Sequence, residues 1–322
     1  MRGMGGYVAK RIALLIPVLL GVTFLVFVLL NVLPGGSVLA ILGSSATGGS
    51  KAELAKQLGL DHPFFYRYVL WLWHALHGEL GTSFITKQPV TSTIFSRLPV
   101  SLELVILAML IALVTAVPAA ILSARRPLGI ADWIVRGVGM FSLSTPSFVV
   151  ALYLLLIFAV KLKVFPVTGF SPISEGLWTN LRTMALPAIT MSLALFGAYT
   201  RILRGDMIDQ LVNEDYVLTA RSKGMPERRI LVMHVFKNSL FSLITIVGAQ
   251  LGTLLGGAAI IETLFGLPGI GQLLLTSINS IDTPVVIAIV VIIATIVVVM
   301  NLLTDLAYMM LDPRVKYGNL GS

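Results

Sequence analysis

The sequence predicts an all-α integral membrane protein with six transmembrane helices. Of the 322 residues, 57% are hydrophobic and 12% are charged, and the mean hydropathy is +0.93. Such a chain has too little polar surface to cover a soluble globule of its size. A helix needs roughly 20 apolar residues to cross a membrane, and six stretches meet or approach that length. These stretches are residues 12–32, 102–122, 138–160, 184–203, 243–261 and 285–303.

The first predicted span follows Arg2, Lys10 and Arg11 and therefore begins like a secretory signal. Its apolar run exceeds the roughly 7–15 residues of a signal, and no A-x-A cleavage site follows it. We therefore expect a retained helix. The chain then divides into an N-terminus with the first helix, an extracytoplasmic insertion, a core of five helices and a cytoplasmic tail, at residues 1–33, 34–99, 100–311 and 312–322.

The basic residues predict the orientation, because Lys and Arg gather in the cytoplasmic loops of membrane proteins. Six crossings place most of the 23 basic residues in one compartment, including those of the N-terminus, of residues 125–136 and of residues 201–237. Both termini are therefore expected in the cytoplasm. The net charge of +8 then serves topology and contact with membrane lipids, and no basic stripe interleaved with aromatic residues points to nucleic acid.

The insertion after the first span is expected to carry two short amphipathic helices. Residues 34–50 are rich in Gly and Ser and indicate a loop, whereas residues 51–80 space their apolar side chains as in a helix broken at Asp61-His62-Pro63. Aromatic side chains in the second half suit a belt at the membrane interface or a landing surface for an external partner. They are Phe64, Phe65, Tyr66, Tyr68, Trp71 and Trp73.

A turn and a short helix are predicted before the last span. The run from Phe265 to Gly269 contains two glycines and a proline, which is a strong turn signal. The apolar stretch 270–278 after it is too short to span a membrane. We therefore expect a surface or re-entrant helix there.

Small residues and prolines predict close packing and kinks within the spans. Gly248, Gly252 and Gly256 recur every fourth residue along the fifth span, which allows another backbone to approach. Prolines within or near the spans permit kinks, because each removes a backbone hydrogen bond. These prolines are Pro17, Pro118, Pro146 and Pro187.

The segment 213–240, between the fourth and fifth spans, predicts a charged hairpin of two helices. Asn213 suits the cap of a helix that starts at Glu214, Gly224 suits the left-handed position after it, and Pro226 can open a second helix that ends near residue 238. Such a hairpin, fixed to two membrane helices, would transmit a push to them. An ordinary charged loop is the alternative, and local physics does not separate the two.

The segment Thr219 to Gly224, TARSKG, resembles the coupling segment in permease subunits of ATP-binding-cassette importers. In that family the segment contains E-A-A, three residues and then Gly. Ala220 and Gly224 match the second Ala and the Gly, whereas Leu218 and Thr219 replace the Glu and the first Ala. Nearly the whole chain, including LGLDHPFFYRYVLWL, RLPVSLEL, ETLFGLPGIGQLL and NLLTDLAYMMLDPRVKY, is similar to the dipeptide and oligopeptide branch of these permeases.

The resemblance implies a permease subunit that moves peptides across the bacterial cytoplasmic (inner) membrane by alternating access. It implies as partners a second similar permease, two ATPase subunits and an extracytoplasmic peptide-binding protein, with ATP and Mg²⁺ on the ATPases. This chain contains no Gly-Lys pair and hence no phosphate-binding loop of its own. The implied ATPase-coupling residues are Glu214, Asp215, Thr219, Ala220, Arg221, Ser222, Lys223 and Gly224.

Two other functions remain open at this point. A permease of the same architecture could carry nickel, glutathione or another small solute. An ion-coupled secondary transporter belongs to a different class, and it would favour carboxylates at the membrane midplane or internal repeats, neither of which is clear in this chain. No catalytic motif is present, so we expect no enzyme activity in this chain.

Candidate residues of a substrate pathway are the polar side chains near membrane depth. Glu103 and Glu262 could face the amino terminus of a peptide, although pairing with Arg97 or Arg182 would be structural. Hydroxyls around Pro146 could line a wet cavity or bond within the helices, and Gln250 could contact substrate or join helices. The hydroxyl residues are Ser142, Ser144, Thr145 and Ser147.

Neither a metal site nor a bound cofactor is predicted. His74, His77 and Glu79 are close in sequence and could suggest a metal, but no further ligands accompany them, which favours surface histidines. The chain has no cysteine, so thiolate ligands and disulfides do not arise.

Overall fold

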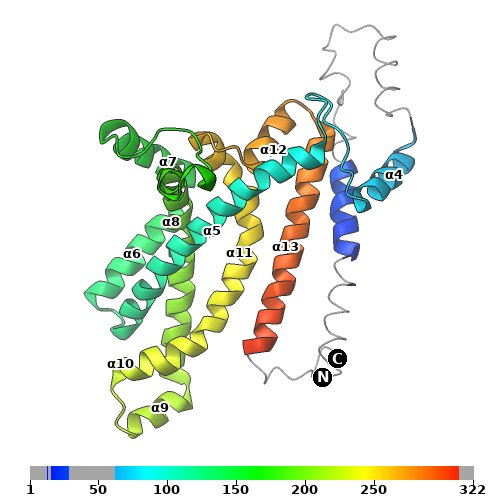
Figure 1. The fold of residues 1–322 in the computed structure, drawn as a ribbon. Helices are drawn as coiled ribbons and strands as arrows, with labels where there is room; N and C mark the ends of the chain where they lie inside the picture. Colours follow the sequence, from blue (N-terminus) through cyan, green and yellow to red (C-terminus); the bar gives the residue numbers. More distant parts are fainter. Residues whose placement is uncertain (1–12, 14–15, 29–61, 312–322) are drawn as a thin grey trace. The chain divides into compact units, whose positions relative to one another are not determined.

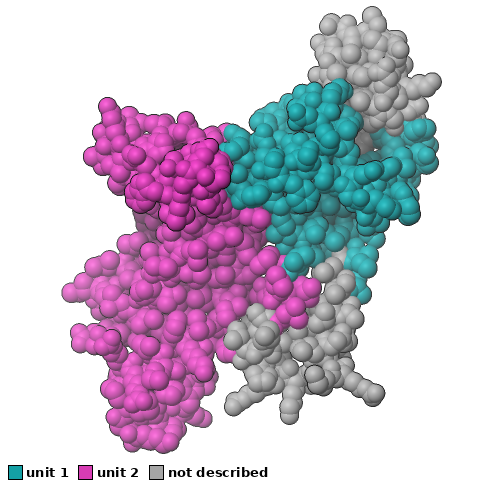
Figure 2. Space-filling view, in the orientation of Figure 1, with its two compact units in different colours: residues 1–101, 268–299 teal, residues 102–267, 300–322 magenta. Residues whose placement is uncertain are grey.

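The computed structural model describes residues 13, 16–28 and 62–311, and these residues are helical throughout apart from their turns. An isolated antiparallel bridge joins Thr82 and Pro89, and the described residues form no longer strand. The prediction of an all-α protein is confirmed. The chain divides into two compact units, residues 1–101 with 268–299 (unit 1) and residues 102–267 with 300–322 (unit 2), which Figure 2 colours separately.

Four helices of the described residues are long and apolar enough to cross a membrane (Figure 1). They contain the second, fourth, fifth and sixth predicted spans. Of the first predicted span, the structure describes the apolar helix Ile16–Val28 and Ala13, and the rest lies outside the described residues. The four long helices are α5 (Val90–Arg125), α8 (Leu177–Asn213), the helix Glu227–Phe265, and α13 (Thr283–Leu311).

The third predicted span is not one straight helix. Two helices that bend by 103° at Pro146 replace it: α6 (Ile130–Ser144), and α7 (Ser147–Leu154) with its π-helical continuation η1 (Leu155–Lys161). Thr145, with ψ of 124°, leaves the helical region, as expected of a residue that precedes proline. The bend falls at Pro146, one of the prolines predicted to permit a kink.

The helix Glu227–Phe265 joins the predicted hairpin to the fifth span without a break. It consists of α10 (Glu227–Ile230), a π-helical segment η3 (Leu231–Val235) and α11 (Phe236–Phe265). The predicted end of the second hairpin helix near residue 238 is wrong. Because no Gly or Pro occurs between residues 227 and 247, the backbone hydrogen bonds can continue from one segment into the next.

Unit 1 packs α4 (Phe64–Leu76) against the helix Ile16–Val28 and the start of α13. Phe27, Tyr68 and Ile287 form a buried cluster, and the Tyr68 hydroxyl lies 2.9 Å from Thr23 Oγ1. Phe64 and Trp71 pack against this cluster, whereas Phe65, Tyr66 and Trp73 are exposed. Helix α4 is the second of the two predicted amphipathic helices, and the first lies outside the described residues.

The turn and short helix predicted before the last span are confirmed. Gly266 ends α11 with a positive φ of 67°, and α12 (Ile270–Asn279) follows. Within unit 1, Ser101 Oγ accepts a hydrogen bond of 2.8 Å from the Ile270 N–H at the start of α12. After α12, the Asp282 carboxylate accepts hydrogen bonds from the Ser83 hydroxyl and from the Phe84 N–H.

Helix α8 is the centre of unit 2 and packs against α6, α7 and α11. Helices α6 and α8 meet at glycines, since a Cβ atom added to Gly197 would lie 2.6 Å from the Gly139 carbonyl oxygen. On α11, Gly248 lies against Thr304, with which an added Cβ would overlap. Gly252 is also buried but Gly256 is exposed, so the predicted stripe of small residues packs along part of its length.

Candidate functional site

The hairpin lies at one end of unit 2, and α7 lies at the opposite end (Figure 1). Helix α8 continues through Asn213, whose side-chain amide donates a 2.6 Å hydrogen bond to Asp209 one turn earlier. The extended residue Glu214 then turns the chain, and α9 (Asp215–Ser222) begins. The prediction that Asn213 caps the new helix is wrong, because Asn213 still belongs to the old one.

The tight turn after α9 forms as predicted. Gly224 takes a left-handed conformation with φ of 72°, and its N–H donates to the Arg221 carbonyl at 2.9 Å. The Met225 N–H donates to the Ala220 carbonyl at 3.2 Å, which closes the end of the helix. Pro226 is the residue before α10 rather than its first residue.

Helix α9 is fixed to two long helices by buried contacts. Val217 and Ala220 are buried, and the Tyr216 hydroxyl donates a 2.6 Å hydrogen bond to Gln210 Oε1 on α8. The Gln210 amide in turn donates to Ser239 Oγ on α11 at 3.2 Å. Burial raises the pKa of the Tyr216 phenol, so this donor keeps its proton. These hydrogen bonds therefore connect α9 to α8 and, through Gln210, to α11.

The opposite face of the hairpin is exposed and charged. Seven of the eight predicted coupling residues lie on it: Glu214, Asp215, Thr219, Arg221, Ser222, Lys223 and Gly224. Ala220, the eighth, is buried within unit 2. Leu218 lies among the exposed residues with 65% of its surface accessible, which provides an apolar contact point in a charged surface.

An ion pair closes the hairpin from α9 to α10. Arg221 donates two hydrogen bonds to the Glu227 carboxylate, at 2.7 and 3.3 Å, and this interaction raises the pKa of Arg221. The pair lines a hollow of about 400 Å³ between the hairpin and the ends of α5 and α8. Arg125, Pro127 and Val212 contribute to the same hollow. The hairpin thus presents a charged surface beside a recess, a shape suited to docking.

A second polar cluster, unforeseen in the sequence, joins α5, α6 and α8. Arg204 donates two hydrogen bonds to Asp132, at 2.6 Å from Nε and 2.8 Å from the terminal nitrogen Nη2. The same carboxylate accepts hydrogen bonds from the Ser123 hydroxyl and from the Leu128 N–H, the latter at 2.9 Å. Leu128 has a positive φ of 65°, so Asp132 also holds a strained turn.

The two predicted pathway carboxylates are placed differently. Glu103 Oε1 is buried and has no hydrogen-bond partner among the described residues. Glu262 has a fully buried side chain near the end of α11. Arg182, suggested as a structural partner, donates instead to the Val164 carbonyl at 3.0 Å.

The predicted pathway hydroxyls and amide mainly bond locally. Ser142 donates to the Val138 carbonyl and Thr145 to the Phe141 carbonyl, each at 2.8 Å within α6. Gln250 Oε1 accepts from Thr253 at 3.1 Å. Ser144 and Ser147 are exposed on either side of Pro146.

The histidines of unit 1 form local contacts. His74 Nδ1 lies 2.9 Å from Glu79 Oε2, and His77 Nδ1 lies 2.8 Å from the Trp73 carbonyl oxygen. Across the part of the chain that the structure describes, no group of three or more potential ligands could hold a metal ion.

The fold and the hairpin together define a multi-pass helical membrane protein with an exposed, charged hairpin. A family model described as a binding-protein-dependent transport system inner membrane component matches residues 116–317. A second model, for the N-terminal part of such a membrane component, matches residues 4–105. The chain belongs to this family of binding-protein-dependent transport system inner membrane components and is a transport permease, not an enzyme.

Named relatives match the chain along nearly its whole length. It is 34% identical to the oligopeptide transport system permease protein AppB of Bacillus subtilis, over 98% of this chain and 100% of the relative. It is 31% identical to the dipeptide transport system permease protein DppB of Escherichia coli, over 97% of this chain and 98% of the relative. A crystal structure of an amino acid ABC transporter with histidines aligns with a TM-score of 0.49 and 17% identity, covering 70% of this chain and 95% of that chain.

Proposed function

We propose that this chain is the permease subunit of an ATP-driven importer that carries dipeptides or oligopeptides across the bacterial cytoplasmic membrane. The similarity to permeases named for oligopeptide and dipeptide transport, sustained over 97–98% of the chain, carries the proposal. Family membership alone identifies a membrane component of a transport system that depends on a binding protein. The identity of the cargo as a peptide goes beyond family membership and rests on the named relatives.

The proposed assembly contains a second similar permease, two ATPase subunits and an extracytoplasmic peptide-binding protein. The ATPases would hold ATP and Mg²⁺, since this chain has no phosphate-binding loop. The hairpin supports this arrangement, because it combines an exposed charged surface with buried anchors on α8 and α11. In this proposal the hairpin and both termini face the cytoplasm.

The proposed mechanism is alternating access driven from the hairpin. Closure of the ATPases on ATP would draw the hairpins of the two permeases together and tilt α8 and α11 toward an outward-open state. The external binding protein would then release its peptide into the pathway. Hydrolysis would reset the inward-open state, and no covalent bond to the permease would form.

Glu103 and Glu262 are proposed to meet the amino terminus of the peptide. The unpartnered Oε1 atom of Glu103 supports this role, because a buried carboxylate oxygen without a donor is costly unless a ligand completes it. The same architecture could carry glutathione or nickel, and the cargo must therefore be tested directly.

Reconstitution tests the proposal. Proteoliposomes would contain this chain with its partner permease, both ATPases and external binding protein, and uptake of labelled dipeptide, oligopeptide, glutathione and nickel would be measured with ATP inside. We expect ATP-dependent peptide uptake and ATPase stimulation by the peptide-loaded binding protein. Uptake of glutathione or nickel in place of peptide would refute the peptide assignment, and the absence of any ATP-dependent uptake would refute the importer.

A further inference from the structure

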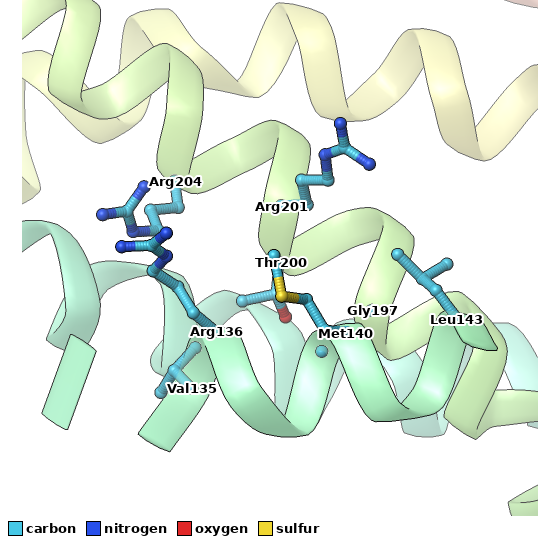
Figure 3. Close-up of a pocket in the computed structure, with 9 residues that line it drawn as sticks. Val135, Arg136, Met140, Leu143, Gly197, Thr200, Arg201 and Arg204 are labelled. Carbon is cyan, nitrogen blue, oxygen red and sulfur yellow. The ribbon is translucent and has the colours of Figure 1, made fainter. Parts of the chain in front are cut away.

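A cavity of about 420 Å³ lies between α6 and α8, and the coupling hairpin does not contribute to it (Figure 3). Its lining from α8 consists of Gly197, Thr200, Arg201 and Arg204, which are spaced to share one face of the helix. Residues 135–143 of α6 form the facing wall. The close contact of Gly197 with Gly139 fixes the two helices together, so the cavity belongs to a defined helix pair.

The cavity carries positive charge that the described part of the chain does not neutralise. Arg204 is paired with Asp132, but Arg136 and Arg201 form no ion pair there. Arg136 lies over the Trp133 ring, with its guanidinium carbon 5.3 Å from the ring centroid. Figure 3 shows the Arg136 and Arg204 side chains together at one end and Leu143 at the other.

The Thr200 hydroxyl is a buried polar group that lines the cavity. Thr200 is only 3% exposed, lines the cavity, and its hydroxyl oxygen has no hydrogen-bond partner among the described residues. Such groups are nearly always satisfied in folded proteins. A ligand with acceptor oxygens would satisfy this hydroxyl and balance the positive charge that lines the same cavity, which indicates an anion with several oxygens, such as a phosphate.

The position of the cavity indicates that the phosphate belongs to a lipid. Arg136 precedes the apolar stretch that begins at residue 138 of α6, and Arg201 and Arg204 lie at the end of the stretch that closes at residue 203 of α8, which places these arginines near headgroup depth. Beyond them, exposed Met140 and Phe141 on α6 offer an apolar surface of the kind that acyl chains cover. Exposed Trp133 is typical of the membrane interface.

We propose that the cavity between α6 and α8 binds the headgroup of an anionic phospholipid, held by Arg136, Arg201 and the Thr200 hydroxyl. Such a lipid ties α6 to α8, and α8 leads directly into the hairpin. Lipid binding does not depend on which cargo the transporter carries, because the lipid comes from the membrane around the chain.

The test titrates the purified full-length chain in detergent with phosphatidylglycerol or phosphatidylcholine and counts bound lipids by native mass spectrometry. The variant Arg136→Gln/Arg201→Gln should lose about 30-fold in phosphatidylglycerol affinity, since it removes two interfacial cations. Phosphatidylcholine binding should not change. The matched control, Arg125→Gln/Arg126→Gln, removes the same charge from exposed residues outside the cavity and should retain the affinity.

Two further variants separate a specific site from a folding defect. Thr200→Val keeps the shape of the side chain but removes the hydroxyl, and should weaken phosphatidylglycerol binding about fivefold. Arg201→Gln changes one exposed side chain and should weaken binding while leaving the thermal unfolding temperature of the chain unchanged.

Several outcomes would overturn the lipid proposal. Equal losses in the cavity and control variants would show general attraction to the basic surface. Displacement of phosphatidylglycerol by inorganic phosphate at the same concentration would identify a soluble anion as the ligand. Displacement by a dipeptide would assign the cavity to the carboxyl terminus of the cargo.

Discussion

At the scale of single residues, Asp132 is the most constrained charge in unit 2. Its carboxylate is fully buried and accepts hydrogen bonds from a guanidinium, a hydroxyl and a backbone N–H. A buried carboxylate is tolerated when it is paired and hydrogen-bonded in this way. The cluster therefore holds the end of α5 and the start of α6 against α8, and its Arg204 also lines the cavity of the proposed lipid.

Replacing Asp132 with Asn should destabilise the protein strongly. Arg204, with 19% of its side chain exposed, would lose its partner, and breaking a buried pair typically costs about 3–5 kcal/mol. Thermal unfolding of the purified chain in detergent measures the effect. Asp209→Asn is the matched control, because Asp209 is exposed on α8 and should tolerate the change. Equal unfolding temperatures for the two variants would show that the pair contributes nothing.

Sequence patterns identify some of these residues and miss others for a physical reason. Gly224 is predictable, because a glycine after a capped charged helix suits a left-handed turn regardless of the rest of the fold. Asp132 and Arg204 are 72 positions apart. Each alone resembles an ordinary loop or interface charge, and their pairing follows only once α6 is packed on α8.

At the scale of the element, α9 is a short helix made rigid by its anchors. Eight residues are too few for a stable isolated helix in water. Three contacts stabilise α9 in place of length. They are the hydrogen bond from Tyr216 to Gln210, the burial of Val217, and the ion pair between Arg221 and Glu227. We therefore expect the hairpin to keep its shape when a partner presses on its exposed face.

Gly224→Val should uncouple ATP hydrolysis from transport. No atom lies within 4 Å of the position of an added Cβ, so the cost is conformational: a left-handed backbone disfavours a β-branched residue by about 1–2 kcal/mol. We expect fewer peptides transported per ATP in the reconstituted system. Gly205→Val, on an exposed helical turn of α8 with open space around it, should leave that ratio unchanged. An unaltered ratio in both variants would remove the turn from the coupling pathway.

The sequence predicts where the long apolar helices lie better than it predicts where they bend. Long apolar runs identify α5, α8, α11 and α13, because each must satisfy its backbone internally. The bend at Pro146 was not separable from the prolines at 118 and 187, which lie inside continuous helices. Tertiary packing decides which proline breaks a helix, and the sequence does not display that packing.

At the scale of the whole molecule, the absence of cysteine allows the topology to be measured directly. The unsubstituted chain offers no thiol to a maleimide, so each engineered cysteine reports its own side of the membrane. Gln88 and Ser222 are both exposed, the former in the turn before α5 and the latter at the end of α9. They are predicted to lie on opposite sides.

Gln88→Cys should react with a membrane-impermeant maleimide in intact cells, whereas Ser222→Cys should react only after permeabilisation. The excess of basic residues around the hairpin gives the reason, since such loops remain in the cytoplasm. Gel-shift labelling of the two variants is the measurement, with the cysteine-free chain as the blank. Labelling of Ser222→Cys in intact cells would place the hairpin outside and exclude contact with cytoplasmic ATPases.

The unbroken helix Glu227–Phe265 would act as a lever if the hairpin were displaced. Its 39 residues extend about 58 Å, so a rotation of about 10° around one end carries the other about 10 Å if the helix moves as one body. A small movement at α10 would thus become a displacement as wide as a helix at Phe265, beside the left-handed Gly266. The π-helical segment η3, which follows α10, is the place where the hydrogen-bond pattern of this helix changes and where we expect it to bend first.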